Sequence, residues 1–384
     1  MPDFEQIIFD RKTLNPIKKW WIDIDKVNFL LAIFLITFGL IISLSASPAV
    51  ANKISVDPLL FIKKQAVFVF LAIFTICLTS FFTKQHIKLI GLFGFLFCLI
   101  LLLLVFFLGD EAKGAKRWIM IFGFAIQPSE FAKTFFLVFN ALLLHKLSST
   151  KWFIKYGLST SFYLATTFLL ILQPDFGMSL VFTALWLIQL FVFGLPLLLI
   201  ALCIFLGLIG AISAYFMMPH VADRVNKFLN FNQSNYQVER SVDAYVNGGF
   251  FGTGPGSGIV KQHIPDAHTD FIFAVIGEEF GLIFCLFLML ILVLIITRAM
   301  KYALNEKDLF SKLAVIGIIS QIALQSLINI GVSIGMLPTK GMTLPFISYG
   351  GSSLLAVSIG FGVILSLTKK KYDNKINYDN ISLG

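Results

Sequence analysis

The sequence predicts an all-α, polytopic membrane protein with about ten transmembrane helices, and three observations carry this prediction. Of its 384 residues, 58% are hydrophobic and only 13% are charged, about half the charged share of a soluble domain. The apolar residues fall in long runs, and about 20 apolar residues can span a bilayer as a helix. The net charge of +9 sits between these runs, which indicates membrane topology and argues against nucleic acid as a partner.

Ten apolar runs follow one another along the chain. They lie at approximately 28–46, 65–82, 89–108, 129–145, 154–172, 178–194, 196–217, 271–297, 310–335 and 351–368. The first run is long and follows a mostly polar segment, so we interpret it as an uncleaved span rather than a signal peptide. The expected organisation is a tail at 1–27, one membrane domain at 28–368 and a tail at 369–384.

Lysine and arginine are distributed unevenly between the two sides of the membrane. An even number of spans puts both termini on one side, and that side carries 18 basic residues against 11 on the other. Because cytoplasmic segments carry the excess of positive charge, both termini are predicted to be cytoplasmic. The longer Gly- and Pro-rich connections, above all 218–270, then lie outside, where we expect the functional residues.

A basic motif precedes the fourth span. The segment GAKRWI contains Lys116, Arg117 and Trp118 on the outer side, against the positive-inside trend. Arginine binds phosphate through two parallel hydrogen bonds, so this excess charge suits a phosphate ligand. Trp118 is also typical of an ordinary interface anchor.

A charged pair follows in the motif QPSEFAK. Glu130 and Lys133 are three residues apart and share one helix face. Charges at the edge of the hydrocarbon are costly unless they satisfy one another or face a cavity. The pair is therefore expected either to lock the helix or to face a ligand.

The motif QPDFG, residues 173–177, joins the fifth and sixth spans. Proline and glycine predict a tight outer turn. Asp175 is either an acid that caps this turn or a residue that contacts substrate.

The 218–270 connection carries the richest set of polar residues. Gln237 lies in YQVERS, and a glycine-rich stretch at 248–258 permits either close approach to a ligand or flexibility. Asp270, at the end of PDAHTD, is expected to be either the N-cap of the eighth span or a general base at the membrane surface. His268 is placed to tune Asp270 or to bind substrate.

Two acids continue into the eighth span. Buried acids within a span are functional candidates by default, and Glu278 and Glu279 are such acids. The alternative for both is a hydrogen bond between helices.

The segment 335–353 contains two prolines and several glycines, which break the helix at outer membrane depth. Irregular backbone there must be buried in protein or line a wet cavity. Lys340 is its only charge, and it is expected to bind a phosphate, to pair with an acid such as Asp270, or to reach water.

No metal-binding pattern is visible in the sequence. All four cysteines fall in apolar runs without metal-ligand spacing, which is typical of small core residues. No cofactor is therefore predicted, and a divalent cation such as Mg or Mn is left open because it would assist a phosphate leaving group.

The motifs GAKRWI, QPSEFAK, QPDFG, PDAHTDFIFAVIGEE and LPTKGMTLPFISYGGSS occur in this order and resemble the SEDS family of cell-wall polymerases (FtsW, RodA, SpoVE). The likeness covers about 28–368, and its wording is closer to the cell-division member than to RodA. The resemblance implies a ten-helix bundle and peptidoglycan glycosyltransfer from lipid II, an undecaprenyl-pyrophosphate-linked disaccharide pentapeptide. It also implies that Asp270 is the catalytic carboxylate and that Arg117, Trp118, Glu130, Lys133 and Lys340 matter for activity or cavity architecture.

The resemblance further implies partners and a place in the cell. These are a class B penicillin-binding protein acting as transpeptidase, other divisome proteins, and the septum of the bacterial cytoplasmic (inner) membrane. Four basic residues are expected to stabilise the departing pyrophosphate: Lys116, Arg117, Lys133 and Lys340. The alternatives are a lipid II flippase, a RodA-type elongation polymerase and a non-enzymatic scaffold. Polar motifs on one side only argue against a transporter, which needs access from both faces.

Overall fold

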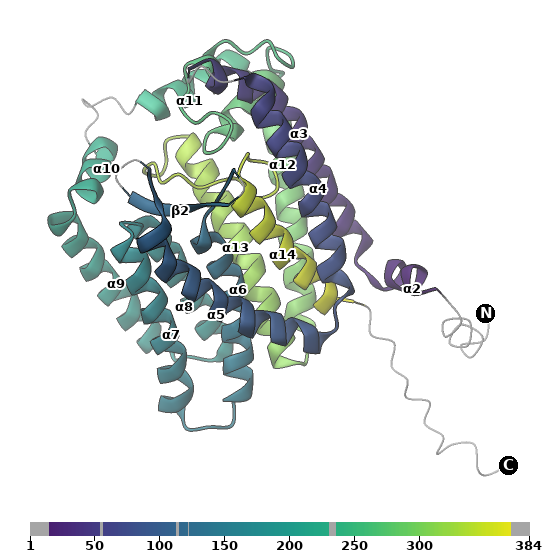
Figure 1. Cartoon of the computed structure of the whole chain (residues 1–384), viewed down its shortest axis with the longest axis vertical. Coiled ribbons are helices and arrows are strands. Elements are labelled where there is room, and N and C mark those ends of the chain that lie inside the picture. Colours follow the sequence, from purple (N-terminus) through teal and green to yellow (C-terminus); the bar gives the residue numbers. More distant parts are fainter. Residues whose placement is uncertain (1–14, 54–56, 113–114, 122, 230–235, 370–384) are drawn as a thin grey trace.

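The structure is a computed structural model that describes residues 15–53, 57–112, 115–121, 123–229 and 236–369. Most of both predicted tails, at 1–14 and 370–384, lies outside the described residues. Within the described ranges, ten helices of 17 residues or more form one bundle (Figure 1). They are α3 (Lys26–Lys53), α4 (Pro58–Phe81), α5 (Lys84–Leu108), α6 (Pro128–Lys146), α7 (Trp152–Leu172), α8 (Phe176–Phe193), α9 (Leu197–Met217), α12 (Ile272–Asn305), α13 (Leu309–Ser333) and α14 (Gly351–Leu367).

These helices confirm the predicted all-α membrane architecture. Seven of them are long and apolar enough to cross a bilayer, namely α3, α4, α5, α8, α9, α12 and α13. The helix α14 is apolar but shorter, and α6 carries a buried ion pair. Each long helix falls on one of the ten apolar runs in the sequence.

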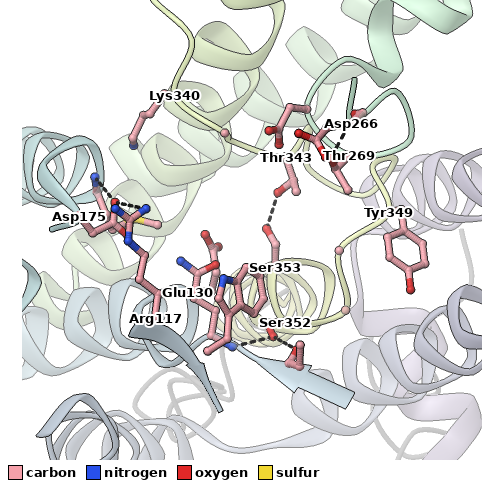
Figure 2. Close-up of a pocket in the computed structure, with 18 of the residues that line it drawn as sticks. Arg117, Glu130, Asp175, Asp266, Thr269, Lys340, Thr343, Tyr349, Ser352 and Ser353 are labelled. Carbon is pink, nitrogen blue, oxygen red and sulfur yellow. Dashed lines mark hydrogen bonds and ion pairs between the residues drawn. The ribbon is translucent and has the colours of Figure 1, made fainter. Parts of the chain in front are cut away.

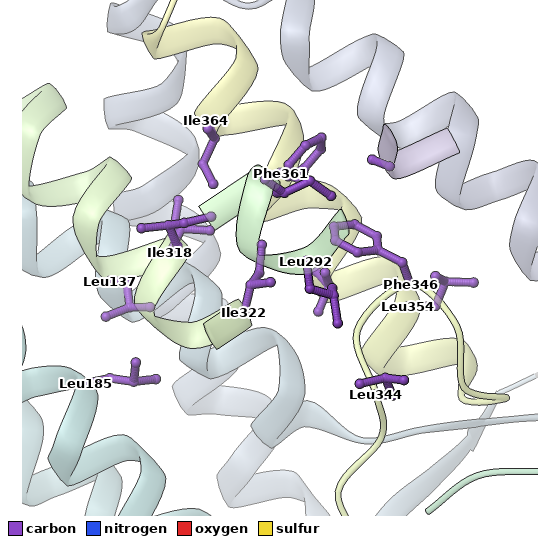
Figure 3. Packing of buried hydrophobic residues seen from close by; sticks show 14 of the residues in the cluster. Leu137, Leu185, Leu292, Ile318, Ile322, Leu344, Phe346, Leu354, Phe361 and Ile364 are labelled. Atoms are coloured by element: carbon purple, nitrogen blue, oxygen red, sulfur yellow. The ribbon is translucent and has the colours of Figure 1, made fainter. Parts of the chain in front are cut away.

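The helix α13 lies near the centre of the bundle and packs against α6, α8, α12 and α14. Figure 3 shows part of this packing: Ile318 and Ile322 of α13 belong to the same buried apolar cluster as Leu137 of α6, Leu292 of α12 and Phe361 of α14. A Cβ at Gly360 of α14 would lie 2.8 Å from Ile318 Cγ2, so a small residue there allows the two helices to approach closely. The centre of the bundle is therefore a rigid base for the segments that join its helices.

One end of the bundle holds the first and last described residues. The short helix α2 (Pro16–Asp23) packs there through Trp20, which donates to Ser80 Oγ (2.8 Å) and stacks on Phe81. Ser366, near the end of α14, donates to the Phe82 carbonyl (2.6 Å) at the same end. The glycine-rich and polar segments gather at the opposite end, as an even number of spans requires.

A small antiparallel sheet was not predicted. It consists of β1 (Asp110–Ala112), β2 (Ala115–Ile121) and β3 (Phe124–Ile126), in the order β1-β2-β3. Lys116 and Arg117, which were expected to lead into the fourth span, lie on β2, whereas α6 begins at Pro128, as predicted for that span. The hairpin pairs backbone groups that would otherwise be unsatisfied at the edge of the membrane.

The described residues of the 218–270 connection also include regular secondary structure. It contains α10 (Pro219–Leu229), α11 (Tyr236–Gly248) and a 3-10 turn, Val260–Gln262. The glycine-rich stretch, expected to approach a ligand or to be flexible, packs against α12. There α12 is broken at Gly281 (φ 79°), and the stretch supplies hydrogen bonds to the break: Thr253 N donates to Glu278 O (2.9 Å), and Leu282 N donates to Gly249 O (2.9 Å).

Glu278 and Glu279 stabilise the same junction. The Glu278 carboxylate is fully buried and accepts from the backbone N–H groups of Ile259, Val260 and Lys261 at 2.7–2.8 Å. Glu279 pairs with the buried Lys261 ammonium and accepts from Ser45 of α3. Both acids therefore join α12 to other segments, which is the structural alternative expected from the sequence.

Candidate active site

A cavity of about 950 Å³ lies at the end of the bundle that carries the sheet. It is large enough for a ligand of several hundred daltons. Side chains from α4, the sheet, α6, α8, α10, α11 and the segments before α12 and α14 line it. Its walls thus come from segments that are distant in the sequence and that the bundle brings together.

One wall of the cavity is basic, and Figure 2 shows Arg117, Asp175 and Lys340 along it. Arg117 donates through Nε to the Gln173 carbonyl (3.1 Å) and through Nη2 to the Pro174 carbonyl, and its Nη1 lies 3.8 Å from Asp175 Oδ1. Strand β2 is therefore fixed to the turn before α8.

Asp175 and Lys340 complete this wall. Asp175 caps α8 by accepting from Met178 N (3.3 Å), so it is the turn acid expected from the sequence, and it also lines the cavity. A Cβ at Gly177 would lie 2.6 Å from Lys340 Cε, so the lysine chain lies against this glycine. Two cations from separate segments, Arg117 and Lys340, therefore reach the same wall.

The Glu130–Lys133 pair is both a structural pair and part of the site. Lys133 Nζ lies 3.0 Å from Glu130 Oε2, and the lysine side chain is fully buried. Glu130 lines the cavity, whereas Lys133 lies beneath it. The lysine stabilises a carboxylate that would otherwise be an unpaired charge at the cavity floor.

A second part of the cavity wall carries two carboxylates, Asp266 and Asp270, and Figure 2 shows Asp266 and Thr269 across the cavity from Arg117 and Asp175. The N-cap position of α12 is occupied by Phe271, so Asp270 is not the cap that the sequence allowed. Asp270 is partly exposed. A Cβ at Gly341 (φ 73°) would lie 3.3 Å from Asp270 Oδ2, so the backbone next to Lys340 approaches this carboxylate closely.

His268 lies behind this wall. It is 6% exposed, and its ring packs against both Phe61 and Tyr349, with centroids 5.2 and 4.9 Å away, in a cluster of three mutually contacting rings. Burial lowers the pKa of His268 to about 4, although the nearby Asp266 charge opposes the shift. The imidazole is therefore neutral near pH 7, and Tyr349 lines the cavity in its place.

The structure brings together seven of the ten predicted site residues. These line the cavity: Arg117, Trp118, Glu130, Asp175, Gln237, Asp270 and Lys340. Lys116 is exposed on β2 and lies outside the cavity lining, while Lys133 and His268 are buried next to it.

Hydroxyl groups form a further part of the lining that sequence reasoning missed. Thr343 donates to Ser353 Oγ (2.7 Å), and Ser352 accepts from Gln127 N (3.0 Å) and donates to the Ala125 carbonyl (3.2 Å). Figure 2 shows these side chains between the basic wall and Tyr349. The motif SYGGSS marked their backbone as irregular, but only the fold shows that these hydroxyls face a cavity.

Asp266 and Asp223 also line the cavity. Among the described residues, no three His, Cys, Asp or Glu side chains gather as a metal site. A divalent cation would therefore take one or two carboxylates, such as Asp266 and Asp270, and depend on substrate phosphates for other ligands.

The chain matches known sequences over most of its length. The family described as cell cycle protein (FtsW/RodA/SpoVE) matches residues 25–373. A probable peptidoglycan glycosyltransferase FtsW of Caulobacter vibrioides is 34% identical over 365 residues, covering 94% of each chain. The protein of the same name from Haemophilus influenzae is 35% identical over 370 residues, covering 89% of this chain and 90% of that one.

Solved structures show the same fold. A chain from a peptidoglycan synthase complex that coordinates polymerization and crosslinking superposes with a TM-score of 0.76 at 27% identity, covering 91% of this chain and 98% of that one. The rod shape determining protein RodA of Thermus thermophilus gives a TM-score of 0.68 at 27% identity, with 91% and 97% covered.

Proposed function

We propose, because the chain belongs to the FtsW/RodA/SpoVE family of cell cycle proteins, that it is a peptidoglycan glycosyltransferase that polymerises lipid II during cell division. The family membership predicted from five motifs is confirmed, and the curated relatives carry the name of the division member. The observation that carries the proposal is the cavity, which is lined by the cations Arg117 and Lys340 and by the Asp270 carboxylate, close to the backbone next to Lys340. This arrangement suits a substrate with a pyrophosphate at one end of its sugars and a reactive hydroxyl at the other.

The reaction joins two lipid-linked disaccharides in the cavity. The Asp270 carboxylate takes the proton from the 4-hydroxyl of the acceptor N-acetylglucosamine, and that oxygen forms a bond to the anomeric carbon of the donor muramyl sugar. The bond between this carbon and the pyrophosphate oxygen breaks, and the polyprenyl pyrophosphate leaves as an anion. Arg117 and Lys340 stabilise the charge that develops on the leaving group.

Other residues hold the site in shape for this step. Two ion pairs fix the wall that carries the cations. Glu130 pairs with Lys133, and Asp175 lies close to Arg117. Trp118 and Gln237 line the cavity and are suited to contact sugar rings by packing and hydrogen bonding.

The elongation alternative is less well supported than the division role. The RodA structure is 27% identical to this chain, whereas the two FtsW relatives are 34% and 35% identical over similar coverage. The transporter alternative needs access from both faces, and the large cavity lies at one end of the bundle.

The proposal extends to partners and cellular location. A structural relative belongs to a complex that coordinates polymerization and crosslinking, which supports a class B penicillin-binding protein as transpeptidase partner of this chain. The division role adds other divisome proteins and the septum. We also propose cytoplasmic termini, which would put the cavity on the outer side, where lipid II sugars are presented.

Polymerisation of purified lipid II tests the proposal directly. Wild type and Asp270→Asn are each co-purified with the transpeptidase, and glycan strands are followed by gel. Loss of a general base is expected to lower the rate by about 100-fold or more, with unchanged thermal stability and complex formation.

Asp266→Asn is the matched control, because it removes a second carboxylate from the same wall. If Asp270→Asn makes glycan at the wild-type rate, Asp270 is not the general base. If Asp266→Asn is then the inactive variant, Asp266 is the base. If the wild-type complex moves lipid II across vesicles without polymerising it, the protein is a transporter.

A further inference from the structure

The backbone segments that carry Asp270 and Lys340 are joined by one buried amide. Asn329 lies on α13 and is 1% exposed. Its Nδ2 group donates to the Asp270 carbonyl (2.8 Å) and to the Met342 carbonyl (2.6 Å). Both hydrogens of this amide are therefore used, one on each of the two segments.

The turn before α12 is held at two further points. Ser348 donates to the Thr269 carbonyl (2.6 Å) and accepts from Leu344 N (2.8 Å), and Tyr349 N donates to the His268 carbonyl (2.9 Å). Three successive carbonyls, at 268, 269 and 270, are thus bound by α13 and the 342–349 segment.

On the side that faces Asn329, away from the large cavity, there is little room for either segment to move. A void of about 20 Å³ lies beside Asn329, and Asp270, Gly341 and Met342 are among the residues that line it. A space of this size holds about one water molecule. Asn329 belongs to α13, which packs against four other helices near the centre of the bundle, so its position is well fixed.

We infer that Asn329 is a positioning residue, which sets the distance between the Asp270 carboxylate and the Lys340 ammonium by binding the backbone of both segments. The inference rests on the proposed function, in which one group removes a proton while the other stabilises the leaving group. Both act in the same transition state, so a misplacement of about 1 Å costs on the order of 100-fold in rate.

A buried asparagine at another place in the bundle provides a matched control. Asn140 is fully buried, donates to Gln189 Oε1 (3.0 Å) and accepts from Ser159 Oγ (2.7 Å). It joins α6, α7 and α8 and is absent from the cavity lining. Asn140→Leu therefore removes comparable buried hydrogen bonds elsewhere. It leaves intact the bonds from Asn329 and Ser348 to the carbonyls at 269, 270 and 342, which together form the proposed clamp.

The experiment combines kinetics with amide hydrogen exchange on the purified complex. Asn329→Leu is expected to lower kcat for lipid II polymerisation by about 100-fold while KM changes little, because the substrate-binding side chains remain. Exchange is expected to accelerate in peptides covering 266–271 and 341–344 together. Asn140→Leu is expected to lower thermal stability with neither of these effects.

Two further variants keep the test decisive if Asn329→Leu folds poorly. Ser348→Ala removes the hydrogen bond to the Thr269 carbonyl and the one from Leu344 N. It should accelerate exchange in 266–271 with a smaller loss of kcat than Asn329→Leu. Asn329→Asp keeps the size of the side chain but loses the amide donor, so wild-type kcat in this variant would overturn the inference.

Exchange that rises in only one segment, or a fall in kcat equal to that of Asn140→Leu, would also overturn it. If wild type makes no glycan, the proposed function fails. Faster exchange in both segments of Asn329→Leu would still show that Asn329 joins them.

Discussion

At the scale of single residues, the chain holds two kinds of buried charge. Glu130 lines the cavity, with Lys133 beneath it, whereas Glu278 accepts three backbone N–H groups from 259–261 and joins two segments. The sequence marked both acids as candidates. It could not separate them, because the partners of Glu278 are 17 to 19 residues away and meet it only when α12 and the 3-10 turn pack together.

His268 provides a prediction about pH. Its pKa is lowered to about 4 by burial, whereas an unfolded histidine titrates near 6.5. Between these values the unfolded state binds a proton that the folded state does not, so stability rises with pH across the window and is fully present above about 6.5. We expect the free energy of unfolding of the detergent-solubilised protein to fall by up to about 3 kcal/mol as the pH falls from 6.5 to 4.

Two variants distinguish the contribution of His268 from that of other groups that titrate in this pH range. His268→Phe lacks the titrating ring and should lose most of the pH dependence in a denaturation series. His263→Gln, at an exposed position in the same connection, should retain it. A wild-type pH dependence that persists in His268→Phe would mean that other groups cause it.

At the scale of elements, apolar runs in the sequence predict where helices form, but they do not predict where a helix is interrupted. The run at 271–297 indicated one span, yet α12 extends to Asn305 and is broken at Gly281. The break depends on the 249–254 segment, which supplies its hydrogen bonds. The sheet was missed for a related reason, because β1 and β3 have only three residues each, too few for a visible alternation of apolar and polar residues.

The junction at the break predicts different effects for two adjacent glycines. A Cβ at Gly248 would collide with the backbone carbonyl of Gly277, whereas Gly249 (φ 56°) has open space around it. Gly248→Ala should lower stability by about 1–3 kcal/mol through overpacking, and Gly249→Ala by about 1 kcal/mol through its left-handed backbone. Thermal unfolding of both variants measures the difference, and a larger loss of stability for Gly249→Ala than for Gly248→Ala would contradict the packing seen here.

At the scale of the whole molecule, the sequence predicts the bundle better than the cavity. Ten spans follow from composition and length alone. The cavity draws Lys64 from α4, Arg117 from β2, Asp223 from α10 and Tyr349 from the segment before α14. The sequence did not predict that Lys64, Asp223 and Tyr349 line a cavity, because this depends on which helices are neighbours in the fold. The motif residues Asp270 and Lys340 were found because polar residues at membrane depth are unusual.

The proposed orientation of the bundle predicts a labelling pattern. Single cysteines are introduced at the exposed positions Ser257 and Asn305 in a chain that lacks Cys77, Cys98, Cys203 and Cys285. A membrane-impermeant maleimide should label Ser257→Cys in intact cells and Asn305→Cys only after lysis. The opposite pattern would put the cavity in the cytosol and remove the basis for polymerisation outside the cell.

The break in α12 has a mechanical consequence. The longer portion, from Leu282 to Asn305, has 24 of the 34 residues of the helix and at about 1.5 Å per residue is long enough to cross the hydrocarbon by itself. The shorter portion, which follows Asp270, is bound to the glycine-rich stretch, and Asn329 of α13 binds the Asp270 carbonyl. A bilayer that thins or thickens tilts spanning helices. Because the helix is interrupted at Gly281, we expect a tilt of the longer portion to displace the Asp270 carboxylate less than a continuous helix would.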